Sequence, residues 1–420
     1  MFLIYWKWKV GNGVAGLCDT LGIVYDIADD SDSVDYALYD TIVPSPWVAP
    51  HHDVYKTGSV KSELDFAYEY LPEDFRIIAV TGTDGKSTTA WILYELLRME
   101  YGEERVYLSG NFDMPLSATV REILSKKQKN GYIVVEVSSF MAYSLEVFAS
   151  EYSIFTNFRP DHLNWHWDLQ GYLDAKMHLF AHTEKASIIN SQVIEFAKTQ
   201  VLSIDLPEVL RIFSWDREDM SDRTDWEYII VSGKQRYRLS DTHFSWKHNA
   251  LNILAVAIVA DEMDIPSEHV WSHLRDITGL PHRLELVREK WWIKWIDDSK
   301  STSCQSLEAA LTAFPKSSTI LIAWGSDKWD IFDGLEHALS GMKYAVLIGA
   351  TRDILAEKCT LAGVAYAFAL DMEEAVERSY AQAVSGDTIL LSPGCASFGL
   401  FRDYLDRAEK FRSAIVHISE

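Results

Sequence analysis

The chain of 420 residues is longer than one ordinary domain, so we expect two or three domains. Its 48% hydrophobic and 24% charged residues are typical of a globular protein. The net charge of −23 argues against a nucleic-acid backbone or an anionic membrane surface as the main partner. Four scattered cysteines without a CxxC pair indicate reduced thiols in a cytoplasmic protein rather than disulfides or a zinc site.

The first segment with a motif is "GNGVAG", Gly11 to Gly16, which follows a predicted strand over residues 2–8. This is a literal G-x-G-x-x-G, and Asp26 after the second strand could supply the acid of a NAD-binding fold. A loop that holds a nucleotide diphosphate at a helix N-terminus fits equally well. A tight turn that only packs the chain closely is the third reading, and all three stay open at this point.

Apolar runs then alternate with helical patterns along the chain, which predicts parallel α/β sheets. Further strands are expected at 22–27, 39–45, 75–80, 132–137, 152–158, 186–190, 291–298, 318–324, 344–349 and 387–393, and an edge hairpin at 226–239. Helices are expected at 86–100, 168–182, 246–261, 266–277, 305–313, 372–384 and 399–415. The joints "LPEDF" and "GLPHR" divide the chain into 1–72, 73–280 and 281–420.

The stretch "TGTDGKST", residues 81–88, lies between a predicted strand and a predicted helix. Gly82 and Gly85 permit unusual backbone angles, so that successive N–H groups can cradle phosphate oxygens. Lys86 can reach terminal phosphates, and the hydroxyl of Ser87 or Thr88 can bind magnesium. Asp84 is an acid among the expected phosphate positions, but its side chain can face outward while the backbone N–H groups face the ligand.

A second polar group follows two later strands. Glu136 comes near the end of a predicted buried strand, where open α/β sheets place ligands, and beside a phosphate loop it could bind magnesium. Asp161, His162 and His166 follow the next strand, and Lys176 lies on the following helix. Taken alone, this histidine segment could also be zinc-like or a helix cap with a solvated histidine.

The order of motifs resembles the Mur ligases, which are ATP-dependent enzymes that add amino acids to the peptidoglycan precursor. The matching segments are "GTDGKST", "GN", "EVSSF", "TNFRPDHLNWH", Lys176, "HNALN", "GLPHR", "DDSKST" and "LLSPGCASFGLF". Within the family, the last two favour the members that add D-glutamate to UDP-N-acetylmuramoyl-L-alanine. The resemblance implies an α/β fold of three domains: a small N-terminal Rossmann-like UDP-binding unit, a central P-loop ATPase-type parallel sheet and a C-terminal Rossmann-like domain.

The resemblance also implies residue roles. ATP would bind through Thr81, Gly82, Thr83, Gly85, Lys86, Ser87, Thr88, Asn249, Asn252, Arg283 and Asp298. Mg²⁺ would be held by Ser87, Glu136, His162 and Lys176, the last as a carbamate. The substrates would contact Gly13, Val14, Ala15, Asn111, Ser138, Thr302, Lys328, Ser397 and Tyr404, and the catalytic residues would be Lys86, His162, Lys176 and Lys300.

The implied reaction converts the terminal carboxylate of the UDP-muramoyl-peptide into an acyl-phosphate, which the amine of D-glutamate then attacks. We therefore expect a cytoplasmic monomer whose partners are small-molecule substrates, without nucleic acid or membrane. Three alternatives remain: a ligase of the same superfamily with another amino acid or acceptor, a NAD-dependent oxidoreductase that uses the N-terminal glycines, and a nucleotide-dependent switch without amide chemistry.

Overall fold

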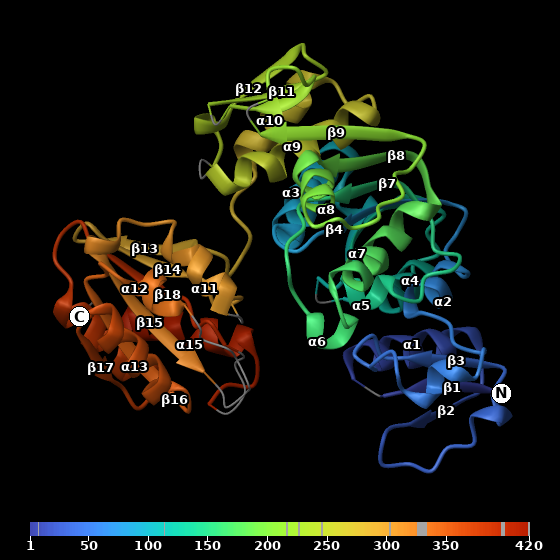
Figure 1. Cartoon of the computed structure of the whole chain (residues 1–420), viewed down its shortest axis with the longest axis horizontal. Coiled ribbons are helices and arrows are strands. Elements are labelled where there is room, and N and C mark those ends of the chain that lie inside the picture. Colours follow the sequence, from blue (N-terminus) through green and yellow to red (C-terminus); the bar gives the residue numbers. More distant parts are fainter. Residues whose placement is uncertain are drawn as a thin grey trace. The chain divides into compact units, whose positions relative to one another are not determined.

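The computed structural model describes residues 1–6, 8–112, 114–215, 217–225, 227–244, 247–301, 304–325, 334–395 and 400–418. These residues form two compact units, Met1–Thr278 and Gly279–Glu420. The first unit contains two separate sheets and the second contains one (Figure 1). Within the described ranges, no helix is both long and apolar enough to cross a bilayer.

A three-stranded parallel sheet of order β2-β1-β3 begins the first unit. Its elements and the helix that follows are β1 (Phe2–Tyr5), α1 (Lys9–Leu21), β2 (Tyr25–Ala28), β3 (Thr41–Pro44) and α2 (Glu63–Tyr68). One buried apolar cluster runs from Ile4 and Val43 of this sheet to Ala79 and Ile133 of the next. A shared apolar core therefore crosses the predicted boundary at residue 72. A separate UDP-substrate-binding domain at residues 1–72 stays a prediction.

The second sheet of the first unit has nine strands in the order β12-β11-β10-β9-β8-β7-β4-β6-β5. The strands are β4 (Asp74–Thr81), β5 (Val106–Gly110), β6 (Asn130–Glu136), β7 (Ser150–Phe155), β8 (Thr183–Asn190), β9 (Leu210–Trp215), β10 (Asp222–Thr224), β11 (Tyr228–Val231) and β12 (Gln235–Arg238). The helices are α3 (Lys86–Tyr101), α4 (Leu116–Ser125), α5 (Ser139–Ala142), α6 (Leu163–His166), α7 (Leu169–Met177), α8 (Ser191–Thr199), α9 (Lys247–Glu262) and α10 (Ser267–Asp276).

This nine-stranded sheet places a ligand site at β4. Strand β4 pairs in parallel with β6 on one side and β7 on the other, so the chain order reverses there. Open α/β sheets bind ligands beyond the carboxyl ends of their strands at such a switch point. The loop after β4 carries the predicted phosphate-loop residues, and the predicted carboxylate Glu136 is the last residue of β6. The predicted edge hairpin is confirmed as the antiparallel pair β11–β12.

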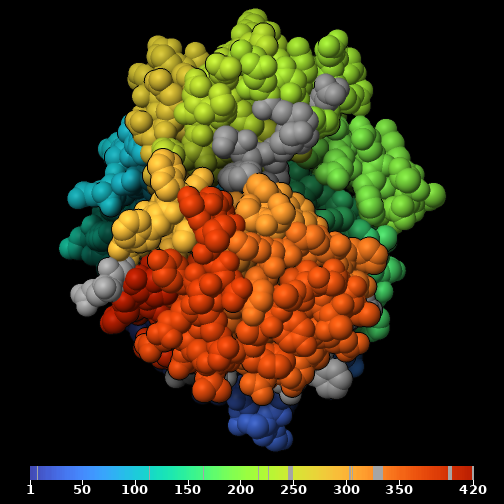
Figure 2. Space-filling model, turned by 90° about the vertical axis from the view of Figure 1, so that its left-hand side faces the viewer, coloured from blue at the N-terminus to red at the C-terminus, as the bar shows by residue number. Residues whose placement is uncertain are grey.

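The second unit is a six-stranded sheet of order β13-β14-β18-β15-β16-β17, parallel except for β13. Buried apolar clusters cover both of its faces, and Figure 2 shows its packed outer surface in orange and red. The strands are β13 (Glu285–Lys290), β14 (Ile293–Asp297), β15 (Thr319–Gly325), β16 (Tyr344–Gly349), β17 (Tyr366–Phe368) and β18 (Thr388–Leu391). The helices are α11 (Cys304–Leu311), α12 (Leu335–Leu339), α13 (Arg352–Ala362), α14 (Met372–Gln382) and α15 (Tyr404–His417).

One sequence prediction about the N-terminal glycines is wrong. Gly13, Val14 and Ala15 lie inside α1 and are buried, whereas the sequence was expected to form a loop there. A Cβ atom on Gly13 would lie 2.6 Å from the Ser117 Oγ atom of α4. The glycine therefore permits close packing of α1 on α4. Contact of Gly13, Val14 and Ala15 with the UDP-substrate stays a prediction.

Candidate active site

The loop between β4 and α3 has a conformation that only glycine tolerates at two positions. Gly82 has a φ of 147° and Gly85, which precedes α3, a φ of 76°. A Cβ atom would lie 1.9 Å from Thr156 Oγ1 if added to Gly82, and 2.5 Å from Asn252 Oδ1 if added to Gly85. Both glycines therefore serve close approach as well as left-handed geometry. The loop leads into the N-terminus of α3, which favours anions.

Asp84 lies in the middle of this loop, but its side chain faces outward. Its backbone carbonyl accepts hydrogen bonds from Thr156 Oγ1 at 2.6 Å and from Asn157 Nδ2 at 3.0 Å. Its carboxylate, which is about half exposed, forms an ion pair with Arg159. The expectation that this side chain faces outward is confirmed. Thr156 and Asn157 were not singled out in the sequence, although "TNF" directly follows β7.

Two lysines meet at the backbone carbonyl of Gly82. Lys86 donates to Gly82 O at 3.1 Å and to Thr83 O at 2.8 Å, while Lys176 of α7 donates to Gly82 O at 2.7 Å. Lys176 is 1% exposed. Burial, and next the nearby charge of Lys86, hold the pKa of Lys176 well below its usual range. The structure thus brings together two predicted catalytic lysines from segments 90 positions apart.

Glu136 at the end of β6 faces the same region. Its backbone pairs with Val80 of β4, and the side chain is 2% exposed. Asn111 Nδ2 donates to Glu136 Oε1 at 2.9 Å, whereas Glu136 Oε2 has no hydrogen-bond partner among the residues that the structure describes. A buried carboxylate oxygen without a donor is costly unless a cation binds it. Glu136 therefore fits a hard divalent cation.

His162 lies at the start of α6 with a φ of 52° and is partly exposed. Burial, followed by the charges of Lys86 and Lys176, lowers the pKa of His162, and the nearby Asp161 carboxylate opposes this shift. The positive charges of Lys86 and Lys176 therefore act on the His162 ring. Lys86 and Lys176 thus meet at the end of β4, Glu136 ends the neighbouring β6, and His162 lies in the segment after β7. The roles of these four residues stay predictions.

His166 has a different environment from the loop position that the sequence suggested. It ends α6, is 3% exposed, and its Nε2 atom lies 2.9 Å from Ser139 Oγ. Burial, with smaller effects from Lys176 and His162, lowers its pKa to about 4. A neutral, enclosed imidazole does not fit a solvated helix cap. Nearby, the Ser138 hydroxyl caps α5 by accepting from Met141 N.

Asn249 and Asn252 lie on α9 and are both buried. Asn252 Nδ2 lies 3.3 Å from Asn249 Oδ1, and the Asn252 amide faces Gly85 of the phosphate loop. Ser87 is also buried, one residue into α3. These residues adjoin the loop as expected for nucleotide contacts, although those roles stay predictions.

The second unit holds Arg283, Asp298, Lys300 and Tyr404. Asp298 is almost fully buried, and it accepts hydrogen bonds from Leu284 N at 3.2 Å and Ser392 Oγ at 2.7 Å. Burial raises its pKa to about 7, and the Ser392 bond and the Arg283 charge oppose this. The Lys300 ammonium lies 5.7 Å from the centroid of the Tyr404 ring. Thr302, Lys328 and Ser397 lie outside the described residues.

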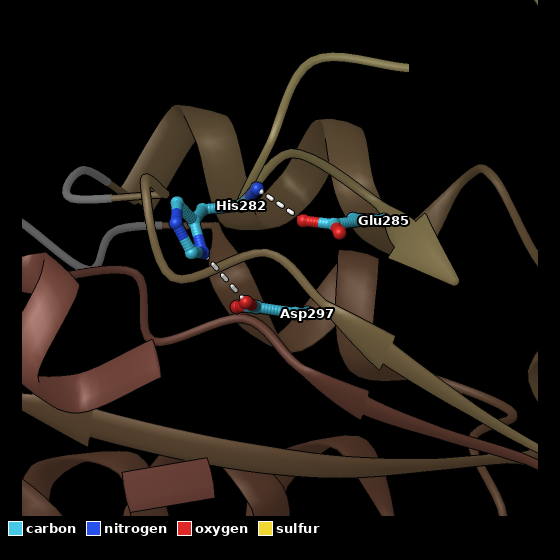
Figure 3. A group of neighbouring side chains, drawn as sticks. All are labelled: His282, Glu285 and Asp297. Atoms are coloured by element: carbon cyan, nitrogen blue, oxygen red, sulfur yellow. Dashed lines mark hydrogen bonds and ion pairs between the residues drawn. The ribbon is translucent and has the colours of Figure 1, made fainter. Parts of the chain in front are cut away.

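A polar network that the sequence did not predict adjoins Arg283 in this unit. His282 Nδ1 lies 2.8 Å from Asp297 Oδ2, and His282 N donates to Glu285 Oε2 at 2.8 Å (Figure 3). The three side chains could hold a cation. However, Arg412 Nη2 already donates to Glu285 Oε2 at 2.5 Å and to Asp297 Oδ2 at 3.2 Å. The guanidinium supplies the positive charge, so the cluster holds the Arg283 loop rather than a metal.

Comparison with known families gives two matches along the chain. Residues 80–260 match the Mur ligase middle domain, and residues 282–395 match the Mur ligase glutamate ligase domain. The chain is 30% identical over 428 residues to UDP-N-acetylmuramoylalanine–D-glutamate ligase of Aquifex aeolicus, covering 99% of this chain and 98% of that protein. The enzyme of the same name from Thermoanaerobacter sp. strain X514 is 31% identical, with 90% and 84% covered.

Solved structures with the same fold are also ligases. UDP-N-acetylmuramate-alanine ligase MurC from Thermotoga maritima superimposes with a TM-score of 0.63 at 15% identity, over 100% of this chain and 99% of that one. MurF ligase from Thermotoga maritima, solved in complex with ADP, superimposes with a TM-score of 0.58 at 15% identity, over 91% and 90%. At these identities the likeness establishes the fold.

Proposed function

Because this chain belongs to the Mur ligase family, we propose that it joins D-glutamate to UDP-N-acetylmuramoyl-L-alanine at the expense of ATP. The D-glutamate-ligase relatives cover the chain almost from end to end, which supports this acceptor and this amino acid over others in the family. A cytoplasmic, monomeric enzyme remains a prediction.

The observation that carries the proposal is the convergence of Lys86 and Lys176 on the Gly82 carbonyl, next to the buried Glu136. The reaction must bring a carboxylate and a triphosphate together, and both are anions. Cations and backbone N–H groups fixed in a partly dry site can offset that repulsion more strongly than in water. Lys86 can swing from the Gly82 and Thr83 carbonyls to a terminal phosphate without moving its backbone.

The unpartnered Glu136 Oε2 atom and the hydroxyl of Ser87 fit a magnesium ion beside the phosphate loop. When bound there, Mg²⁺ would neutralise phosphate charge and orient the reacting oxygens. His162 and a carbamate on Lys176 would complete the set in this proposal. Only the neutral amine of a lysine reacts with CO₂, and the lowered pKa of Lys176 favours that form. The product is an anion, whereas an ammonium at this position would repel the metal.

In the first step, an oxygen of the substrate carboxylate attacks the γ-phosphorus of ATP. The bond from that phosphorus to the β,γ-bridging oxygen breaks, and ADP leaves. In the second step, the neutral amine of D-glutamate attacks the acyl carbon, the carbon–oxygen bond to phosphate breaks, and the nitrogen loses a proton. Lys86 stabilises charge in the first step, and Arg283 and Lys300 are proposed to act on the phosphates and the acyl-phosphate.

Tyr404 and Ser138 are proposed as substrate contacts, together with Asn111, which already orients Glu136. The helical conformation of Gly11–Gly16 weakens the oxidoreductase alternative. A dinucleotide-binding motif needs a glycine loop there, whereas these glycines pack α1 on its neighbours. A ligase for another amino acid or acceptor is the remaining competitor.

A panel of amino acids tests the proposal. The purified protein is incubated with ATP, Mg²⁺ and UDP-N-acetylmuramoyl-L-alanine, and phosphate release is followed with D-glutamate, L-glutamate, L-alanine, L-lysine and diaminopimelate. We expect release with D-glutamate far above the others. Release with another amino acid would redirect the assignment within the family, and release with none would contradict the ligase assignment for this acceptor.

A further inference from the structure

A row of aromatic rings leads from His162 to the loop that follows β3. The ring centroid of Phe140, on α5, lies 4.8 Å from that of His162 and 4.8 Å from that of Trp47. In the same loop, the His51 ring lies 5.9 Å from the ring of Trp167, which directly follows α6. Trp47, His51, Phe140 and Trp167 form an aromatic surface beside the predicted metal ligand, built by segments that follow strands of two different sheets of the first unit.

Both tryptophans of the aromatic surface face solvent. Trp47 is 57% exposed and Trp167 is 71% exposed, whereas Phe140 is buried. Tryptophan carries a large apolar side chain, so leaving two of them in water forgoes the stabilisation that burial would give. A ligand seated on the two indole rings would supply the missing burial, and His162 beside them lies in the proposed active site.

Trp167 is also held in a strained backbone conformation. Its φ of 72° and ψ of −47° lie outside the regions that bulky residues adopt readily. Strain of this kind persists where the surrounding structure enforces it, and it is concentrated at ligand sites. Glycine would adopt the same conformation at little cost, so a tryptophan at position 167 lowers stability. Exposure and strain are both accounted for if the ring binds a ligand.

We propose that Trp47 and Trp167 bind the pyranose ring of the hexosamine in the UDP-linked acceptor, an inference that rests on the proposed function. A pyranose presents apolar C–H groups on its faces and hydroxyls at its rim. The C–H groups carry partial positive charge and the face of an indole ring is negative, so the two faces attract each other. An exposed aromatic surface therefore suits a sugar ring better than it suits the charged parts of the acceptor.

The length of the acceptor places its sugar ring near these tryptophans. The lactyl and alanyl groups between the sugar ring and the reacting carboxylate span about 7 Å at most. The rings of His162 and Trp47 both lie 4.8 Å from the Phe140 ring, so their centroids are at most twice that distance apart. A carboxylate that reacts beside His162 therefore has its sugar ring within reach of Trp47. The uracil lies farther away, because the ribose and the diphosphate separate it from the sugar.

Two glycine substitutions in the full-length protein give a matched test. W167G removes the ring and relieves the strained backbone, and W291G does the same for Trp291, which has a φ of 57° and is 67% exposed in the turn between β13 and β14. Calorimetry measures the Kd for UDP-N-acetylmuramoyl-L-alanine, and ADP formation gives the KM for ATP. We expect the Kd for the acceptor to rise about tenfold in W167G and in W47A, with the KM for ATP unchanged and W291G equal to the wild type.

Two further measurements separate a sugar contact from other roles. The melting temperature of W167G should not fall, because glycine relieves the strain, whereas a ring with a purely structural role would lower it when removed. UDP alone, which lacks the sugar, should bind the wild type, W47A and W167G equally. Unchanged acceptor affinity in both variants would overturn the proposal, and so would an equal loss of affinity for UDP, which would assign the rings to the uracil. A wild-type protein that binds no UDP-N-acetylmuramoyl-L-alanine would contradict the proposed function, and this inference with it.

Discussion

Replacement of Gly85 by alanine tests whether the phosphate loop is built around Asn252. Gly85 has a φ of 76°, and a Cβ atom there would lie 2.5 Å from Asn252 Oδ1. Gly233, in the turn between β11 and β12, has a φ of 67°, but a Cβ atom there would meet nothing within 4 Å. Both G85A and G233A therefore carry the left-handed strain of about 1–2 kcal/mol, and only G85A displaces a neighbour.

The displaced neighbour sets the size of the effect. Asn252 must move its amide by several tenths of an ångström or more, and its 3.3 Å contact with Asn249 is lost, at about 1 kcal/mol. If Asn252 contacts the nucleotide, a further interaction is lost in the complex. A lost hydrogen bond to the nucleotide costs about 1.5 kcal/mol, so the KM for ATP in G85A should rise about tenfold, while G233A keeps the wild-type KM.

The assay is a coupled measurement of ADP formation with ATP varied at saturating D-glutamate and acceptor, alongside thermal unfolding of both variants. Unfolding reports the shared backbone strain, and KM reports the contact with Asn252. Equal KM values for G85A, G233A and the wild type would show that Asn252 does not shape the nucleotide site, and the reasoning from the loop geometry would then fail.

Four further predictions concern single residues. K176A should lose activity and regain part of it with added short carboxylates, measured as phosphate release; no recovery with any of them would rule out the carbamate. E136Q should raise the Mg²⁺ concentration needed for half-maximal rate, because the unpartnered carboxylate oxygen is replaced; an unchanged Mg²⁺ titration would exclude Glu136 as a ligand. D84N should change kcat and the KM for ATP by less than about twofold, since its pair with Arg159 is solvent-exposed; a large loss would place the carboxylate at the ligand. Asp298 has a pKa of about 7, above its value near 4 in an unfolded chain, so the folded state holds its proton more tightly and stability should fall as pH rises from about 4 to about 7; D298N should lack this part of the pH dependence in denaturant titrations.

The phosphate loop was predictable because its signal is local. A strand, two glycines, a lysine and a helix lie within 28 residues, from Asp74 to Tyr101, and each needs only its neighbours to adopt its conformation. Glu136 was predictable near the phosphate loop because parallel strands end at the same edge of the sheet. The grouping of His162 and Lys176 with it rested on the resemblance to the Mur ligases. The approach of Lys176 to Gly82 could not be read from spacing, since it depends on how α7 packs.

The conformation of the N-terminal glycines could not be predicted, because it depends on a distant part of the chain. Gly11–Gly16 match a loop motif, but the requirement for glycine at Gly13 comes from Ser117, which lies far along the chain on α4. Likewise, the edge strand β13 was not predicted, because its sequence "ELVREK" is rich in charged residues. The network of His282, Asp297 and Arg412 joins three segments, and neither spacing nor periodicity indicated it.

The measurement that tests the account most directly follows an oxygen atom. The acceptor is prepared with ¹⁸O in its terminal carboxylate and turned over with ATP and D-glutamate. If that carboxylate attacks the γ-phosphorus and phosphate later leaves the acyl carbon, one labelled oxygen moves into each phosphate released. We predict this transfer, by mass spectrometry of the phosphate, with no label appearing in ADP. Phosphate that carries no ¹⁸O, while the amide product still forms, would contradict an acyl-phosphate at the Lys86–Lys176 site.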